Sequence, residues 1–170
     1  MLGRDYQGQD CSLARALEVI GERWTLLIVR DAFYGVRRFN DFHAHLDIPK
    51  AVLSDRLRGL VDDGILEARP DPDHGGRRLY ELTACGRALW PVLHALLVWG
   101  ERHYASNSRD FKHAACGADL DETGSCPACD LTPGPEDVLT TPRSGRARRR
   151  DDPVAVALRV PHRLLQPVDT

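Results

Sequence analysis

The 170-residue sequence lacks the features of membrane and secreted proteins. No apolar run approaches the roughly 20 residues that are needed to span a bilayer. The first eleven residues contain neither an apolar signal core nor a cleavage pattern. The sequence therefore predicts a cytoplasmic protein with no membrane partner.

Catalytic motifs and a strong net charge are missing as well. The sequence has no nucleophile elbow, no phosphate-binding loop and no convincing carboxylate pair, so it argues against an enzyme. The formal net charge is −2. Nucleic acid would therefore have to bind a local basic patch rather than the overall charge of the molecule. Lysine is rare, since only Lys50 and Lys112 occur and the other basic residues are arginines.

Cysteine is present in an odd number, five. Without a signal segment, this argues against a secreted disulfide scaffold. Three of the five lie within fourteen residues, from Cys116 to Cys129, and indicate a small separate module.

Composition divides the chain into three parts. The first part, residues 1–108, carries dense helical periodicity over residues 11–105, and residues 109–132 are polar and rich in cysteine. Residues 133–170 contain many prolines, and five arginines lie between Arg143 and Arg150. We expect a folded domain, a short cysteine-rich module and a largely disordered tail.

The first part has the pattern of a winged helix-turn-helix. Apolar spacing predicts helices over about 12–21, 24–33, 39–46 and 50–63, the last two joined by a tight turn. Two short strands, 65–69 and 78–82, flank a segment of turn-forming residues and predict a β-hairpin wing. A long helix, 84–104, capped by Thr83, follows. The fold is thus expected to be mainly α with a small hairpin.

The long helix carries more apolar surface than a small core requires. We therefore expect it to form a homodimer interface together with helix 12–21.

The motifs themselves resemble the HxlR-type bacterial transcriptional regulators, which are relatives of the MarR group. The opening is Cys-Ser-Leu-x2-Ala-Leu-x-Val-Ile-Gly-x-Arg-Trp-Thr-Leu-Leu-Ile-x-Arg, over residues 11–30. Three later motifs continue the resemblance in order: Arg38-Phe39-Asn40-Asp41-Phe42, Leu53-Ser54-x-Arg56-Leu57-x2-Leu60 and Tyr80-x-Leu82-Thr83-x2-Gly86-x2-Leu89. The resemblance covers about residues 11–100. It implies a dimeric regulator that binds operator DNA and represses or activates a neighbouring gene, in response to a redox signal or a ligand.

Basic residues fall on the elements that would face double-stranded DNA. On helix 50–63 the outward residues Ala51, Ser54 and Arg58 are candidates for reading base edges, with Lys50 at the entry of the helix. Arg37 and Arg38 precede the first helix of the pair, where phosphate is expected. Arg77 and Arg78 lie at the wing, within reach of the minor groove. The alternative for any one of these arginines is a solvated surface charge.

The cysteine-rich module has the spacing of a zinc site. His113-x2-Cys116-x9-Cys126-x2-Cys129 would give a Cys3His set for structural Zn²⁺. Two alternatives stay open, a flexible tail with free thiols and a disulfide between Cys126 and Cys129.

Cys11 is a candidate redox-sensing thiol. It lies immediately before Ser12, the expected N-cap of the first helix, where the helix dipole favours a thiolate. The alternative is an inert, half-buried thiol.

Two other function classes compete with a DNA-binding regulator. A thiol oxidoreductase would use Cys126 and Cys129, but that motif requires a preceding strand and a following helix. A protein-binding adaptor would use the winged helix without DNA.

Overall fold

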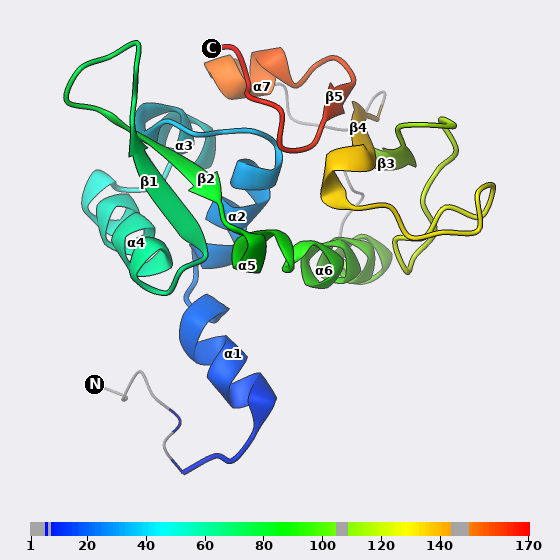
Figure 1. Ribbon diagram of the computed structural model, residues 1–170, viewed down its shortest axis with the longest axis horizontal. Coiled ribbons are helices and arrows are strands. Elements are labelled where there is room, and N and C mark those ends of the chain that lie inside the picture. The colour runs from blue at the N-terminus through cyan, green and yellow to red at the C-terminus, as the bar shows by residue number, and fades with distance from the viewer. Residues whose placement is uncertain (1–5, 7, 105–108, 144–149) are drawn as a thin grey trace.

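The structure, a computed structural model, describes Tyr6 and residues 8–104, 109–143 and 150–170 (Figure 1). The amino-terminal part contains the helices and the hairpin α1 (Ser12–Ile20), α2 (Thr25–Phe33), α3 (Phe39–Leu46), α4 (Lys50–Asp62), β1 (Leu66–Pro70), β2 (Arg78–Leu82), α5 (Ala84–Arg87) and α6 (Trp90–His103). The carboxy-terminal part adds β3 (Arg109–His113), the 3-10 helix η1 (Pro135–Asp137), β4 (Val138–Pro142), α7 (Pro153–Ala157) and β5 (His162–Arg163).

The predicted winged helix-turn-helix is confirmed. Helices α3 and α4 are joined by residues 47–49, where Asp47 takes the left-handed conformation with φ 53°. The antiparallel hairpin pairs Leu66 with Leu82 at its base and Pro70 with Arg78 near its tip. Residues before α3 extend this small sheet, because the N–H of Tyr80 donates to the carbonyl of Arg37 at 2.9 Å.

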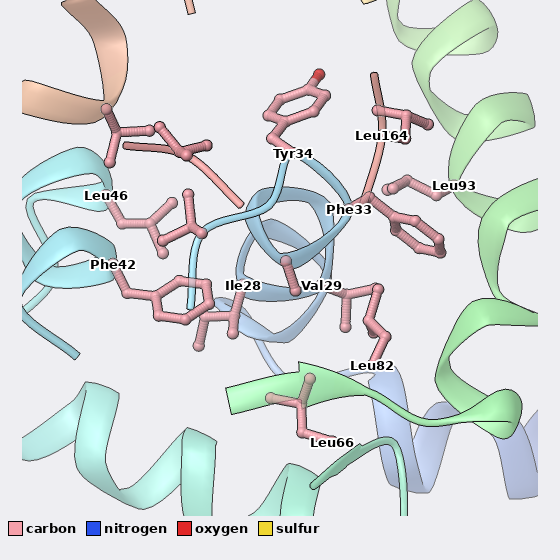
Figure 2. Packing of buried hydrophobic residues seen from close by; sticks show 14 of the residues in the cluster. Ile28, Val29, Phe33, Tyr34, Phe42, Leu46, Leu66, Leu82, Leu93 and Leu164 are labelled. Carbon is pink, nitrogen blue, oxygen red and sulfur yellow. The ribbon is translucent and has the colours of Figure 1, made fainter. Parts of the chain in front are cut away.

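Helix α2 lies at the centre of the hydrophobic core. Its residues Ile28, Val29 and Phe33 are completely buried. Figure 2 shows side chains from α3, the hairpin, α6 and the carboxy-terminal segment pointing towards this helix. The largely apolar sequence of α2 fits a central position, although Leu27 remains exposed.

The expected long helix 84–104 is two helices. Thr83 caps the first of them, since its hydroxyl oxygen accepts the N–H of Gly86 at 3.1 Å. The chain then turns at residues 88–89, and α6 begins with Trp90 and Pro91. Proline lacks the N–H that an uninterrupted helix requires, but it is well suited to the first turn of a new one.

The expectation of a largely disordered tail over 133–170 is wrong for the described residues of that segment. Strands β4 and β5 and helix α7 form there, and these elements and the residues beside them contribute the buried side chains Val138, Val154, Leu158, Leu164 and Val168 to the core. Proline and glycine do interrupt the segment, but each short element buries its apolar side chains against a core that α2 and its neighbours supply. Residues 144–149, which include three of the arginines, lie outside the described residues.

The cysteine-rich segment is tied to this tail by β-pairing. Strands β3, β4 and β5 form an antiparallel sheet, in which Arg109 pairs with Pro142 and His113 with Val138. Phe111 of β3 packs edge-on against Trp90 of α6, with ring centroids 5.3 Å apart. The sheet therefore connects the segment 109–132 to the winged helix through α6.

The last residues of the chain cross the end of α2. The N–H of Leu165 donates to the carbonyl of Phe33 at 2.7 Å, and the N–H of Val168 donates to that of Gly35 at 3.1 Å. Gly35 has φ +85°, and a Cβ at this position would lie 1.6 Å from the carbonyl oxygen of Gln166. Only glycine allows this close approach.

The first prediction concerns this contact. We expect Gly35→Ala to lower the free energy of unfolding by at least about 2 kcal/mol, because the left-handed conformation is strained for alanine and the Cβ overlaps the crossing chain. Urea denaturation measures the change.

Gly59→Ala is the matched control, because nothing lies within 4 Å of a Cβ built on Gly59. This change replaces a glycine inside α4 and should stabilise the protein by up to about 1 kcal/mol. Equal stability of the Gly35 variant and the wild type would show that the crossing segment does not pack as described.

Candidate functional site: helix α4, the wing and the cysteine cluster

Helix α4 presents one face to the core and the other to solvent. Leu53, Leu57 and Leu60 are buried, at spacings of four and three residues. The opposite face is exposed and consists of Lys50, Ala51, Ser54, Asp55, Arg58 and Asp62. The four residues predicted to meet DNA from this helix therefore share one accessible surface, together with two carboxylates.

The wing is held in shape by a buried carboxylate. Asp71 is 4% exposed; its side chain accepts from Arg38 Nε at 3.1 Å and lies 3.3 Å from His74 Nδ1. Burial raises the pKa of Asp71, but the N–H of Asp73 and the Arg38 guanidinium outweigh it and lower that pKa overall. The charged carboxylate thus fixes the wing to the residue before α3.

Arg37 makes the second link between these elements. Its guanidinium donates to Glu81 Oε1 of β2 at 3.0 Å. The predicted phosphate ligands Arg37 and Arg38 therefore also position the wing relative to the helix pair. The sequence did not reveal their partners Glu81 and Asp71, because the pairing depends on the strand register and on the curvature of the wing.

Four other predicted cations are more accessible. Lys50, Arg58, Arg77 and Arg78 are exposed, and in the described parts of the chain none of them forms an ion pair. Arg56, in contrast, is half-buried and donates to Glu22 Oε2 at 3.0 Å. That bond ties α4 to the segment between α1 and α2.

The wing arginines border a surface hollow. A cavity of about 490 Å³ lies between the wing and the start of α3, and Arg38, Asn40, Arg77 and Arg78 line it. The two ends of the predicted DNA surface, the first helix of the pair and the wing tip, therefore adjoin one another.

The predicted metal ligands come together. The ligand atoms of His113, Cys116, Cys126 and Cys129 all lie within 4.8 Å of one another. Cys116 Sγ is 3.4 Å from His113 Nδ1 and 3.5 Å from Cys126 Sγ. Four ligands at zinc bond lengths in a tetrahedron lie about 3.8 Å apart, so this donor set fits a metal ion such as Zn²⁺.

The local backbone explains how four separate residues converge. His113-x2-Cys116 and Cys126-x2-Cys129 each form a turn, and the residue after each turn, Gly117 or Asp130, has positive φ. The N–H of Gly117 donates to the carbonyl of His113 at 2.8 Å. The N–H of Ala118 is the main cause of a lowered pKa at Cys116, whereas the neighbouring Cys116 thiol raises the pKa of Cys129 to about 11. The cluster is therefore two similar turns facing one another.

This arrangement differs from both alternatives for the cysteines. All five thiols are free in the structure, so Cys126 and Cys129 form no disulfide there. The next described helix after Cys129 is the short η1, so the strand and helix of a thiol oxidoreductase do not flank the motif.

Cys11 occupies the N-cap position of α1 itself, one residue nearer the helix than the sequence indicated. Its thiol is exposed. The backbone N–H groups of Ala14 and Leu13 lower the pKa of the Cys11 thiol. The exposure departs from the half-buried, inert alternative, and the lowered pKa favours a reactive thiolate.

Helices α1 and α6 leave large apolar side chains exposed. Helix α1 extends away from the body of the molecule (Figure 1), and Ala14 is its only buried residue. The exposed residues are Leu13 and Leu17 on α1 and Val92, Leu96 and Trp99 on α6. None of the helices in the described part of the chain is long and apolar enough to cross a membrane.

Comparisons with known proteins agree with this geometry. Residues 19–108, slightly more than half of the chain, match the model of the HxlR-like helix-turn-helix family. An uncharacterised HTH-type transcriptional regulator of Mycobacterium tuberculosis, Rv3095, is 39% identical over 131 residues, which cover 75% of this chain and 82% of that protein.

Solved structures extend the likeness. The crystal structure of PA1607, a candidate transcription factor, matches 84% of this chain and 99% of its own, with a TM-score of 0.63 and 35% identity. That match reaches beyond the residues that the family model covers. The redox regulator HypR in its reduced form matches 54% of this chain and 92% of its own, with a TM-score of 0.50 and 30% identity. The chain belongs to the HxlR-like helix-turn-helix family of transcriptional regulators.

Proposed function

We propose that the protein binds an operator in double-stranded DNA as a homodimer and represses or activates a neighbouring gene. The observation that carries this proposal is the exposed face of α4 beside the wing. Four cations on these two elements form no ion pair with a carboxylate in the described residues: Lys50, Arg58, Arg77 and Arg78. A helix of this kind fits the major groove, where side chains reach base edges.

The residues on this surface divide into two roles. Ala51, Ser54 and Arg58 contact base edges from the exposed face of α4, and Lys50 contacts phosphate at the start of the helix. Arg77 and Arg78 contact the phosphates or the minor groove from the wing.

Arg37 and Arg38 have a double role in this proposal. Each guanidinium keeps its carboxylate partner and turns its remaining N–H groups to phosphate, since guanidinium has five donors. Asp55 and Asp62 on α4 repel phosphate and so restrict the poses in which the helix can enter the groove.

Dimerisation follows from the exposed apolar faces of α1 and α6. Two copies would cover Leu13 and Leu17 together with Val92, Leu96 and Trp99, which a monomer leaves in water. An operator with two half-sites requires the two-fold axis of this dimer to place both α4 helices on one side.

The cysteine cluster holds structural Zn²⁺ in this proposal. His113, Cys116, Cys126 and Cys129 leave no coordination position for a substrate, which is typical of structural rather than catalytic zinc. The metal would fix the two turns and thereby the loop that lies against α6.

Regulation by oxidation is favoured by the exposed thiol at the start of α1. Cys11 has a lowered pKa and lies on a helix that we assign to the dimer interface. The likeness to the redox regulator HypR supports the same idea. Oxidation of Cys11 to a disulfide with a second thiol, with a diazene oxidant such as diamide taking up the two electrons and two protons, would change the contacts of α1 and so the spacing of the two α4 helices.

The DNA surface is tested by two variants with different expected signatures. Arg58→Ala should cost about 1–3 kcal/mol on a genomic fragment selected by the protein and relax its sequence preference. Arg77→Ala should weaken binding to every sequence and reduce the salt slope by about one. Fluorescence anisotropy at several salt concentrations measures both effects.

Arg87→Ala, on α5 away from this surface, is the control and should bind like the wild type. If Arg58→Ala lowers the affinity for selected DNA and for random DNA by the same factor, Arg58 contacts phosphate rather than bases.

The dimer is tested by placing a charge in the apolar face. Trp99→Glu should raise the dimer dissociation constant at least about tenfold, because burying an unpaired carboxylate is costly. Light scattering across a concentration series gives the mass. Val160→Glu, at an exposed apolar residue outside α1 and α6, should leave the dimer intact, and a monomeric wild type at micromolar concentration would refute the interface.

Metal analysis tests the cysteine cluster. Protein kept reduced during purification should contain about one zinc per chain, by the count of four ligands. Cys126→Ser should abolish zinc binding, while Cys85→Ser, at an exposed cysteine outside the cluster, should retain it. Wild-type protein without zinc would contradict the site.

A gel shift with and without diamide tests Cys11. The oxidant should change DNA binding by the wild type and by Cys85→Ser but not by Cys11→Ser, because only Cys11 combines exposure with the N-cap of α1. If wild type and Cys11→Ser respond alike, Cys11 is not the sensor.

A further inference from the structure

One carboxylate lies near the centre of the surface that we assign to DNA. The side chain of Asp55 is 53% exposed, on the face of α4 opposite Leu53, Leu57 and Leu60. With about 100° of rotation per residue, Asp55 lies about 165° around the helix from the mean direction of those leucines. Figure 1 shows α4 at the edge of the molecule beside β1. Since the leucines face the core, Asp55 faces whatever α4 binds.

Most atoms on the surface of a DNA duplex repel a carboxylate. Phosphate oxygens do so by their charge, and the acceptor atoms of guanine and thymine do so at the base edges. In the major groove, donors come from the amino groups of cytosine and adenine. Adenine carries the acceptor N7 beside its amino group, whereas the edge of cytosine presents the amino group alone. A carboxylate that enters the major groove therefore fits cytosine best.

The carboxylate of Asp55 has an oxygen available for such a bond. Its Oδ2 lies 3.6 Å from Arg56 Nη1, and Arg56 is itself held by the bond from its Nη2 to Glu22. Its Oδ1 accepts no hydrogen bond from any residue that the structure describes. Arg56 offsets part of the repulsion between Asp55 and phosphate, so the carboxylate is not simply excluded from the groove.

Small neighbours allow α4 to approach a duplex closely at this point. The short side chain of aspartate reaches a base edge only where the helix lies deep in the groove. Ala51 and Gly59, four residues before and four residues after Asp55, lie beside it on the helix surface and have little or no side chain. Neither of them would hold the backbone of α4 away from the bases.

Gly59 has no place in the packing that requires glycine. Its backbone is helical, and among the described residues nothing lies within 4 Å of a Cβ built there. Glycine is a poor helix former, so its presence inside α4 disfavours the helix. On one side it borders a hollow of about 320 Å³ between α1 and α4, so space is open there too. Close approach of another molecule explains a glycine at this position.

Arg58 can read the base that pairs with cytosine. In the major groove an arginine bonds O6 and N7 of guanine with two of its N–H groups. Asp55 and Arg58 are three residues apart and so are neighbours on the helix surface, with a rise between them of about 4.5 Å. Consecutive base pairs are about 3.4 Å apart. The two side chains therefore suit one C·G pair or two neighbouring pairs.

We propose that Asp55 is a specificity-determining residue, which accepts a hydrogen bond from the amino group of a cytosine in the base pair that Arg58 reads or in the next one. This contact rests on the proposed function, because it requires α4 to lie in the major groove. It adds one named base to each half-site of the operator. Repulsion from phosphate then keeps Asp55 over the base edges.

The test maps base preference on a genomic fragment selected by the protein. Each base pair is replaced in turn by the other three, and fluorescence anisotropy gives the affinities of the wild type, Asp55→Ala and Arg58→Ala. The wild type should lose at least about tenfold in affinity when the cytosine is replaced. For Asp55→Ala, the four base pairs at that position should bind within about twofold of one another, while other positions keep their preferences. The position that Arg58→Ala affects should be the same one or the next.

Asp55→Asn gives a sharper result. An amide can donate to N7 of adenine and accept from its amino group, so the preference at this position should change from cytosine to adenine. Asp62→Ala is the matched control, because Asp62 is exposed on the same face but is the last residue of α4. The amino-terminal part of such a helix contacts the bases. The control should therefore raise the affinity for every version of the fragment by a similar factor and change no base preference.

A longer side chain tests the close approach. Gly59→Met should be at least as stable as the wild type in urea denaturation, since methionine is a good helix former. It should nevertheless lower the affinity for the selected fragment by a factor of at least about five, because the side chain holds α4 away from the base edges. Unchanged affinity would contradict the close approach on which the reach of Asp55 depends.

Two outcomes would overturn this role of Asp55 while leaving the DNA-binding proposal intact. In the first, Asp55→Ala raises the affinity for every version by the same factor, as the control does. In the second, Asp55→Asn keeps the base preference of the wild type. Even if neither variant folds, a wild type with no cytosine preference at or beside the Arg58 position contradicts the contact. A wild type that selects no fragment would instead overturn the DNA-binding proposal, and this contact with it.

Discussion

Burial of most of α2 is the constraint on which the rest of the structure depends. Six of its nine residues are buried, so the helix is stable only when other elements cover the faces that carry them. The hairpin and α4 cover one side, α3 and α6 cover others, and the carboxy-terminal segment closes the end at Gly35. The helix pair and the wing are therefore positioned by a core to which the tail contributes.

Polar contacts fix how the helices and strands are oriented relative to one another, which apolar packing alone does not determine. His45 of α3 lies 2.9 Å from Asp152, which caps α7 by accepting the N–H of Ala155. Burial raises the pKa of Asp152, but the N–H of Ala155 and the imidazole of His45 lower it overall. The Arg109 guanidinium lies over the ring of Tyr34 and donates to the carbonyl of Leu158 at 2.7 Å. These bonds join the end of α2, the cysteine-rich sheet and α7 into one unit.

The sequence predicted those elements whose pattern lies within a short stretch of residues. The leucines of α4 mark its buried face and so, by opposition, its exposed face. The spacing from His113 to Cys129 marks a set of four metal ligands. The tail was misjudged because its elements are too short and too often interrupted by proline to stand out in the sequence. Val154 of α7 becomes buried only when this short helix packs against α3. The pairing of Arg37 with Glu81 and of Arg38 with Asp71 likewise depends on the hairpin register, which local sequence does not specify.

The central claim is that two copies of the α4 surface bind one operator together. Hydroxyl-radical footprinting on a genomic fragment selected by the protein tests it most directly. The account predicts two protected segments whose centres lie about 34 Å apart, one turn of the double helix. A single protected segment at saturating protein, or no protection on any selected fragment, would contradict it.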